Sequence, residues 1–236
     1  MSETRIALIT GSARGIGLAC ANALSRSGHQ VVGVDIVEHN QGPFLSTHIV
    51  DLGDPKACAE LIDVLPPVDV LVNNAAVLHE VPFESLTLEQ FDETIAVNLR
   101  GPFLLAQGLI GSMGAKGWGR IVNVASVAAR TGAISHAAAY AASKAGLVAF
   151  TKSLARHYGP QGITVNVVLP GGINTPMAQM QIERDPDLLE RVLSQIPVGR
   201  MGEGRDVGEV VAFLASDQAS FVNGATIDIC GGWSMG

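Results

Sequence analysis

The chain reads Thr10-Gly11-Ser12-Ala13-Arg14-Gly15-Ile16-Gly17 between an apolar run, residues 5–10, and an alanine-rich segment, residues 15–27. Gly11 permits a tight turn after a strand, Gly15 lets the backbone approach a pyrophosphate, and Gly17 lets the following helix pack closely on a sheet. The start of that helix offers N–H donors and a partial positive charge to an anion. The stretch therefore predicts a strand–turn–helix unit that holds the phosphates of a dinucleotide, with Gly11, Arg14, Gly15, Ile16 and Gly17 as its contacts.

Strand-like and helix-like segments alternate along the rest of the chain. The expected strands are 5–10, 30–35, 47–50, 68–73, 119–125, 162–168 and 225–229. The expected helices are 15–27, 55–64, 87–112, 138–158, about 176–194 and 206–216. Several strands are apolar throughout, which is typical of strands that helices cover on both faces. The pattern predicts an α/β fold with a doubly wound, Rossmann-like parallel sheet in one domain over 1–236.

Residues 172–205 break this alternation. Glycines and prolines recur there among charged residues and methionines, and the segment follows the strand at 162–168. Ligands of such sheets bind beyond the carboxyl ends of the strands. We therefore expect a loop–helix–loop insertion that acts as a lid over the substrate.

The bulk composition excludes several classes of partner. Lys and Arg total 15 against 22 Asp and Glu, a net charge of −7, and no basic run occurs. Nucleic acids and anionic membranes attract clustered cations, so neither is expected as a partner. The three cysteines and six histidines show no spacing of metal ligands, so we expect no metal. No secretory signal and no membrane-spanning run is evident, which favours the cytoplasm.

Asp35 ends the second expected strand, about 20 residues beyond the glycines, where an acid can bind both hydroxyls of an adenosine ribose. Its charge would repel the 2′-phosphate of NADP. Arg14 favours the opposite choice, because an arginine in the glycine turn can reach that phosphate. We give more weight to Asp35, and the sequence therefore predicts NAD, with NADP as the less favoured cofactor.

Tyr140 and Lys144 open the helix expected at 138–158, and residues four apart share one helix face. A tyrosine with a pKa near 10 is a poor base at neutral pH. A neighbouring ammonium group should lower that pKa, so that Tyr140 can exchange a proton with a substrate oxygen. Ser126 follows the strand at 119–125 and can polarise a carbonyl. Asn98 lies in an apolar stretch and needs buried partners, which a water chain to Lys144 would supply.

In this order and spacing, the motifs resemble the short-chain dehydrogenase/reductase family over essentially the whole chain. The matching stretches are residues 10–17, Asp51-Leu52, Asn73-Asn74-Ala75-Ala76, Asn98, Ser126, Tyr140 with Lys144, Pro170-Gly171-Gly172-Ile173-Asn174-Thr175 and Asp228-Ile229-Cys230-Gly231-Gly232. The resemblance implies that the catalytic residues are Asn98, Ser126, Tyr140 and Lys144. It also implies a homotetramer built through the helices at 87–112 and 138–158.

The resemblance further implies a set of contacts to the cofactor beyond the glycine turn and Asp35. These are Asp51, Leu52, Asn74, Ala75, Tyr140, Lys144, Pro170, Gly171, Ile173 and Thr175. In this reading Asp51 bonds the adenine amino group, and Ile173 and Thr175 contact the nicotinamide carboxamide.

The chain departs from the family pattern in three places. Ala76 stands where the family usually has glycine, and its methyl group narrows the site. Tyr140 follows Ser126 by 14 positions, about one more than is commonest in the family. The stretch between Asp35 and Asp51 is short, so the usual helix there should shrink to a turn. We expect His136, four residues before Tyr140, and Ala76 to contact the substrate.

Together these features predict an NAD(H)-dependent oxidoreductase that interconverts a secondary alcohol or polyol and its ketone. Its partner is then a small alcohol or ketone, with Tyr140 as the acid/base. An NADPH-dependent ketoreductase of the 3-oxoacyl type is the alternative enzyme, supported mainly by Arg14. A nucleotide-sensing protein without catalysis is the alternative from another class, and the intact catalytic set argues against it.

Overall fold

Seven parallel strands form one twisted sheet in the order β3-β2-β1-β4-β5-β6-β9 in the computed structural model, which describes residues 4–133 and 135–235. The strands of this sheet are β1 (Ile6–Thr10), β2 (Gln30–Asp35), β3 (Phe44–Ile49), β4 (Val70–Asn73), β5 (Gly119–Val124), β6 (Ile163–Pro170) and β9 (Thr226–Ile229). The chain reverses its direction of travel across the sheet between β3 and β4, which lie on opposite sides of β1. That reversal opens a crevice at the carboxyl ends of the central strands, where such sheets bind ligands.

Helices cover both faces of the sheet. They are α1 (Gly15–Arg26), α2 (Pro55–Val64), α3 (Leu88–Ile95), α4 (Gly101–Lys116), α5 (Ala128–Thr131), α6 (Ala138–Tyr158), α7 (Pro176–Arg184), α8 (Leu188–Leu193) and α9 (Gly204–Leu214). A π-helical segment, η2 (Ala96–Arg100), joins α3 to α4, and 3-10 turns occur at η1 (Phe83–Ser85), η3 (Gly159–Gln161) and η4 (Asp217–Ala219). No helix within residues 4–133 and 135–235 is long and apolar enough to cross a membrane.

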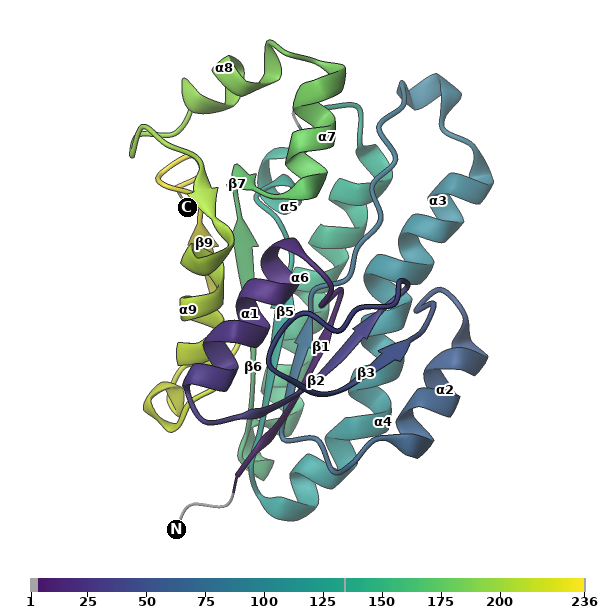
Figure 1. Ribbon diagram of the computed structural model, residues 1–236, viewed down its shortest axis with the longest axis vertical. Helices are drawn as coiled ribbons and strands as arrows, with labels where there is room; N and C mark the ends of the chain where they lie inside the picture. Colours follow the sequence, from purple (N-terminus) through teal and green to yellow (C-terminus); the bar gives the residue numbers. More distant parts are fainter. Residues whose placement is uncertain (1–3, 134, 236) are drawn as a thin grey trace.

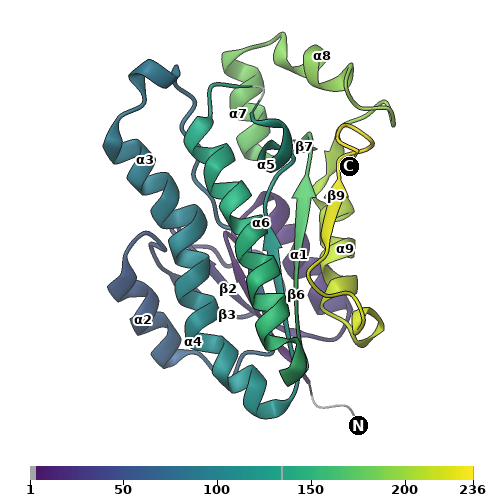
Figure 2. The ribbon, with the colours of Figure 1, turned by 180° about the vertical axis from the view of Figure 1, so that it is seen from behind.

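The core consists of two main apolar layers, one on each side of the sheet. Ala7 and Ile9 of β1 pack in one layer with residues of α1 and α9, whereas Leu8 packs in the other with residues of α2, α4 and α6. Figure 1 shows α1 and α9 in front of the sheet, and Figure 2 shows α4 and α6 on the opposite face. Successive side chains of a strand point to opposite faces, so strands that are apolar throughout are buried on both sides. The predicted fold class is confirmed.

Two predicted helices are interrupted. The helix expected at 87–112 is α3, the π-helical η2 and then α4, which ends at Gly117 in a left-handed conformation with φ 67°. The helix expected at 176–194 divides into α7 and α8 around Pro186, which has no N–H to continue a helix. The turn predicted in place of a helix after Asp35 is confirmed, because residues 36–43 contain no helix.

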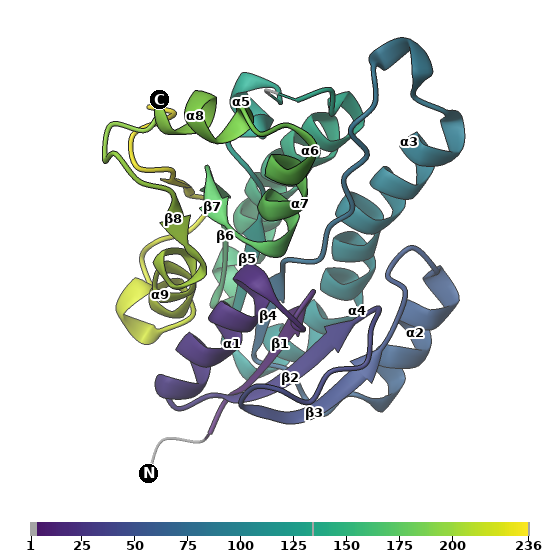
Figure 3. The same cartoon turned by 45° about the horizontal axis from the view of Figure 1, so that its top comes forward.

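The segment 172–205 lies over the carboxyl ends of the strands. It contains β7 (Ile173–Asn174), α7, α8 and β8 (Gly202–Glu203), and its two ends are joined because β7 pairs with β8 in parallel. Figures 1 and 3 show α7 and α8 standing beyond the ends of the central strands. The insertion therefore stands where a lid was expected, directly above the crevice.

Candidate active site

One cavity of about 610 Å³ occupies the crevice between the strand ends and the segment 172–205. Most of the residues singled out in the sequence line it: Gly11, Arg14, Gly15, Ile16, Asp35, Asp51, Leu52, Asn74, Ala75, Ala76, Ser126, Tyr140, Lys144, Pro170, Gly171, Ile173 and Thr175. Gly17, Asn98 and His136 are not among its lining residues. The described part of the chain holds no group of three or more His, Cys, Asp or Glu that could bind a metal ion.

The glycine turn is held in a shape that larger residues could not adopt. Gly11 has φ +65°, and a Cβ there would lie 2.8 Å from the Cα of Ala75. A Cβ on Gly17 would lie 2.0 Å from the carbonyl oxygen of Gly11, so Gly17 acts by letting α1 approach the turn. At Gly15, by contrast, a Cβ would meet its first neighbours only at 3.6 Å. The space beside Gly15 fits the pyrophosphate of a dinucleotide.

Asn74 braces this turn from the neighbouring strand. Its Nδ2 donates to the carbonyl oxygens of Thr10 at 2.9 Å and Gly11 at 3.0 Å, and its backbone N–H donates to Thr10 Oγ1 at 3.0 Å. The sequence predicted Asn74 only as a lining residue. The bracing role depends on β4 lying next to β1, which the local sequence does not reveal.

The N-terminus of α1 is open to an anion. Arg14 is the N-cap residue, its side chain makes no capping hydrogen bond, and the first turn of the helix contains no acidic residue. The first N–H groups of a helix have no partner within the helix, and they favour negative charge. The exposed side chain of Arg14 adds a positive charge at the same place. This end of the cavity fits the phosphates of the predicted cofactor.

Asp35 lies half-buried at the end of β2 and lines the cavity. Its Oδ2 accepts a hydrogen bond from the backbone N–H of Ala13 at 2.9 Å, and its Oδ1 accepts one from Ile36 at 2.8 Å. These two bonds fix the carboxylate against the glycine turn. Asp51 is exposed further along the same edge, and its Oδ1 accepts from the N–H of Gly53 at 2.8 Å. The adenosine end of the cavity therefore carries two oriented carboxylates.

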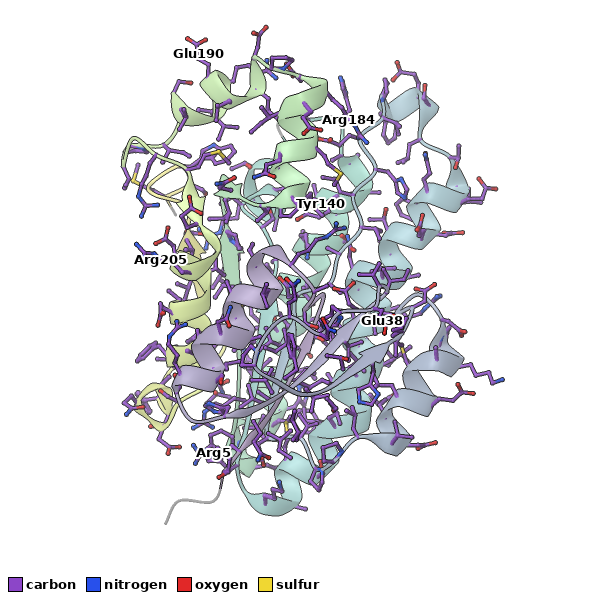
Figure 4. All side chains as sticks on the ribbon, in the orientation of Figure 1. Arg5, Glu38, Tyr140, Arg184, Glu190 and Arg205 are labelled. Carbon is purple, nitrogen blue, oxygen red and sulfur yellow. The ribbon has the colours of Figure 1, made fainter. Side chains whose placement is uncertain are left out.

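Tyr140, Ser126 and Lys144 meet at the other end of the cavity, where Figure 4 shows Tyr140 below α7. Lys144 is buried and its Nζ donates to the carbonyl oxygen of Val124 at 2.8 Å, while lying 5.5 Å from the centre of the Tyr140 ring. Burial raises the pKa of Tyr140 to about 12, and a hydrogen bond with the Ser126 side chain opposes that rise. Burial also lowers the pKa of Lys144 to about 8.

The expectation that Lys144 lowers the pKa of Tyr140 is therefore wrong for this structure. The Lys144 ammonium is directed at the Val124 carbonyl, and the pKa of Tyr140 is governed by removal of the phenol from water and by the opposing hydrogen bond with Ser126. The raised pKa keeps Tyr140 protonated at neutral pH. Tyr140 and Ser126 are joined by a side-chain hydrogen bond and both line the cavity, which suits binding of a substrate oxygen.

Asn98 lies in the π-helical η2 and is fully buried. Its Oδ1 accepts from the N–H of Val77 at 2.8 Å, and its Nδ2 donates to the Val77 carbonyl at 3.0 Å and to Ser143 Oγ at 3.1 Å. Ser143 Oγ in turn donates to the carbonyl oxygen of Tyr140 at 2.7 Å. The buried partners that the sequence required are thus backbone and serine groups, and they tie Asn98 to the first turn of α6.

Two groups of positioning contacts were not found from the sequence, although Asn73 in the second group already belonged to a stretch that matched the family. Ser143 is one, although its place three residues after Tyr140 puts it on a neighbouring part of the helix surface. The other is a buried chain in which Asn73 Nδ2 donates to Asn123 Oδ1 at 2.8 Å and Asn123 Nδ2 donates to Thr151 Oγ1 at 2.8 Å. It fastens α6 to β4 and β5. Buried amides within apolar strands were the signal that could have indicated it.

His136 lies beside a smaller hollow of about 300 Å³, next to the cavity. Its side chain is exposed, and its carbonyl oxygen accepts from the N–H of Val81 at 2.9 Å. The smaller hollow shares Ser135, Gln181 and Leu188 with the cavity. The substrate contact expected of His136 stays a prediction, and residue 134 of the same loop lies outside the described residues.

The comparisons with known proteins agree with this geometry. The family model described as enoyl-(acyl carrier protein) reductase matches residues 11–234. Acetoacetyl-CoA reductase of Rhizobium meliloti (strain 1021) is 39% identical over 241 residues, which cover 97% of this chain and 98% of that protein.

Two solved structures superpose over nearly the whole chain. One is 3-oxoacyl (acyl-carrier-protein) reductase from Agrobacterium tumefaciens C58 with NADP bound, which has a TM-score of 0.90 and 30% identity, covering 97% of this chain and 93% of that one. The other is 4-hydroxyisoleucine dehydrogenase complexed with NADH, with a TM-score of 0.91 and 30% identity, covering 99% of this chain and 100% of that one.

Proposed function

Because this chain belongs to the short-chain dehydrogenase/reductase family of oxidoreductases, we propose that it uses NAD(H) to interconvert a secondary alcohol or polyol and its ketone. The observation that carries the proposal is the cavity itself. It runs from the glycine turn and Asp35 at one end to Ser126, Tyr140 and Lys144 at the other. A dinucleotide bound along it would bring its reactive ring to the proton donor.

The roles of the chain's residues follow from their contacts. The nicotinamide ring of the bound cofactor supplies the hydride for reduction and accepts it in oxidation. Ser126 donates a hydrogen bond to the substrate oxygen, and Tyr140 gives that oxygen its proton as the carbonyl becomes an alcohol. In oxidation Tyr140 takes the proton back. Lys144 holds a positive charge beside the phenol ring, and Asn98 keeps the first turn of α6 in place through Ser143.

Asp35 supports NAD(H) over NADP(H). Its carboxylate is fixed by two backbone N–H groups at the edge of the cavity, so it cannot easily turn away from a ribose placed there. A 2′-phosphate at that position would meet a like charge in a partly desolvated site. Three of the structural neighbours are solved with NADP and one with NADH, so the neighbours favour the alternative cofactor.

The second candidate is an NADPH-dependent ketoreductase of the 3-oxoacyl type. Arg14 is exposed at the same edge as Asp35 and could pair with a 2′-phosphate. The names of an acetoacetyl-CoA reductase and a 3-oxoacyl reductase among the relatives also favour it. A nucleotide sensor without catalysis is less well supported, because Ser126, Tyr140 and Lys144 all line one cavity.

Two measurements test the proposal. The first compares kcat/KM for NADH and NADPH with the same ketone, and a clear preference for NADPH would reject the NAD(H) assignment. The second replaces Tyr140 by phenylalanine, which should abolish turnover and leave the affinity for NADH nearly unchanged. Tyr158→Phe is the matched control, because Tyr158 ends the same helix and does not line the cavity. Undiminished turnover in Tyr140→Phe would rule out the proposed mechanism.

We propose a homotetramer as the assembly. Phe103 of α4 and Phe150 of α6 pack edge to face at 6.3 Å between ring centres on the outer side of these helices, and Phe103 is exposed. Apolar side chains in such a place suit a two-fold interface. Light scattering on the purified protein would test this, and a monomer at working concentration would contradict it. A cytoplasmic location stays a prediction from the sequence.

A further inference from the structure

The part of the cavity beyond Tyr140 is bounded by α7, α8 and the C-terminal segment. Its wall is built from apolar side chains: Met177, Met180, Ile182, Leu188, Leu189, Val192 and Trp233. We propose that the substrate is a neutral, mainly apolar secondary alcohol or ketone, and that polyols and sugar acids are poor substrates. This inference rests on the proposed function and narrows its substrate range.

The helix α7 does not pack its apolar side chains into the core of the protein. None of its nine residues is buried, although Met177, Met180 and Ile182 point their apolar groups into the cavity. Met180 is 45% exposed, and Leu189 of α8 is 37% exposed. Apolar surface of this kind is stabilised when an apolar partner removes it from water. Because the surface faces the proton donor, that partner is the substrate.

The polar side chains around this end are already paired with one another or with the backbone. The pairs are Gln181 Nε2 with Glu80 Oε1 at 2.5 Å, His79 Nε2 with Glu93 Oε2 at 2.8 Å, Trp233 Nε1 with Gln195 Oε1 at 2.9 Å, and Thr131 Oγ1 with the Val127 carbonyl at 3.1 Å. Among the lining residues described here, three polar groups at this end can still meet a substrate hydroxyl: the Ser135 hydroxyl, the Gln181 side-chain oxygen and the second carboxylate oxygen of Glu93. A substrate with five further hydroxyls would leave at least two of them unpaired.

The charged residues around the cavity also disfavour a substrate that carries a carboxylate. The charged residues that line the cavity are Arg14, Asp35, Asp51, Glu93 and Lys144. Arg14 stands at the phosphate end and Lys144 donates to the Val124 carbonyl, so neither is placed for a substrate carboxylate. The adjoining smaller hollow offers no net charge, because Arg184 and Arg191 are opposed there by Glu80 and Asp185.

The size of the effect follows from the desolvation of unpaired hydroxyls. Each buried group without a partner costs about 1–3 kcal/mol, which is at least about fivefold in kcat/KM. A ring with five hydroxyls beyond the reacting one has at most three partners here, in Ser135, Gln181 and Glu93, so at least two hydroxyls stay unpaired. We therefore expect kcat/KM to fall by at least ~25-fold between an alcohol with one hydroxyl and a polyol of the same carbon skeleton.

Cyclohexanol and myo-inositol form a matched pair for this test, because both are six-membered carbon rings. Their oxidation with NAD is followed by NADH absorbance, with gluconate as the carboxylated probe and acetophenone, reduced with NADH, as the aromatic one. Cyclohexanol and acetophenone should react, and myo-inositol and gluconate should be slower by at least ~25-fold. Equal or faster turnover of myo-inositol or gluconate would overturn the inference and leave the proposed function standing.

Variants on α7 test the apolar wall directly. Met180→Gln should raise KM for cyclohexanol about tenfold, whereas Met180→Leu, which keeps an apolar side chain, should leave KM unchanged. The affinity for NADH should not change in either variant. Glu183→Gln is the matched control, because Glu183 is exposed on the same helix and does not line the cavity. An unchanged KM in Met180→Gln would contradict the proposed role of the wall.

Calorimetry on the NADH-saturated Tyr140→Phe variant, in which acetophenone should bind without being reduced, separates the two proposals. Binding of acetophenone without binding of gluconate supports the apolar site, whatever the turnover. Failure of acetophenone to bind, or preferential binding of gluconate, defeats it. The proposed function fails separately if no alcohol or ketone of either class gives turnover that depends on Tyr140.

Discussion

Replacing Asp35 by asparagine removes one negative charge from the adenosine end of the cavity and nearly preserves the side-chain shape. The asparagine oxygen can still accept from the N–H of Ala13 or of Ile36, while its NH2 group loses the other of the two bonds that the carboxylate now makes. The remaining bond and the Asn74 contacts to Thr10 and Gly11 should keep the glycine turn in position. The variant isolates the electrostatic contribution of Asp35 to the choice between NADH and NADPH.

The magnitude can be worked from the position of the carboxylate. Two unit charges about 4 Å apart interact by about 4 kcal/mol at an effective dielectric constant near 20. Asp35 is only half-buried, so water and salt should reduce the repulsion of a 2′-phosphate to ~2 kcal/mol. That free energy corresponds to a change of about 30-fold in relative kcat/KM.

The assay measures kcat/KM for NADH and NADPH with one ketone at low ionic strength. In Asp35→Asn the NADH/NADPH ratio should fall by about 30-fold. Asp51→Asn is the matched control, because Asp51 lies exposed at the adenine end and should affect both cofactors alike. A ratio that does not change in Asp35→Asn would refute the assignment of cofactor choice to this carboxylate. A melting curve of each variant verifies that the fold is kept.

Three further predictions concern the glycine turn, the π-helical segment and the charge of Lys144. Gly17→Ala places a Cβ 2.0 Å from a carbonyl oxygen of the turn, so the melting temperature and the NADH affinity should both fall. Gly111→Ala is the control, because the space around its Cβ is open and both quantities should stay unchanged. Equal effects in the two variants would argue against the close approach of α1 to the turn. Asn98→Ala leaves the N–H and C=O of Val77 without their partner, and the free energy of unfolding in urea should drop by about 2–4 kcal/mol. A loss below ~1 kcal/mol would mean that water replaces the amide. Because burial lowers the pKa of Lys144 to about 8, its ammonium is lost above that pH, and kcat/KM for ketone reduction should decline there. A flat profile from neutral pH into the alkaline range would show that this charge is not needed.

Most elements of the fold could be predicted because their signals are local. The strands β1, β2 and β5 and the helices α2 and α6 begin or end within about a residue of the expected bounds. The break in α3–η2–α4 had a local signal that the predicted helix 87–112 overlooked, because Pro102 in the first turn of α4 lacks the N–H that would continue the helix. The division of α7 from α8 was indicated by Pro186, yet a proline can also merely bend a helix.

The candidate site shows the same division. Gly11, Asp35, Ser126, Tyr140 and Lys144 were recognised from spacing and context, and all of them line one cavity. The direction in which the pKa of Tyr140 shifts could not be predicted from the sequence, because it depends on how much water the whole fold removes from around the phenol.

The amino-acid sequence alone determined the order of strands and helices, the glycine turn and the choice of Tyr140 and Lys144 as the candidate pair. These features depend on residue type and on spacing within single elements, so they can be read along the chain. Only the tertiary structure decided that Asn74 braces the turn, that Ser143 links Asn98 to α6, and that Met180 faces the cavity. Such contacts join residues tens of positions apart, and their distances are fixed only when the sheet and its covering helices pack together.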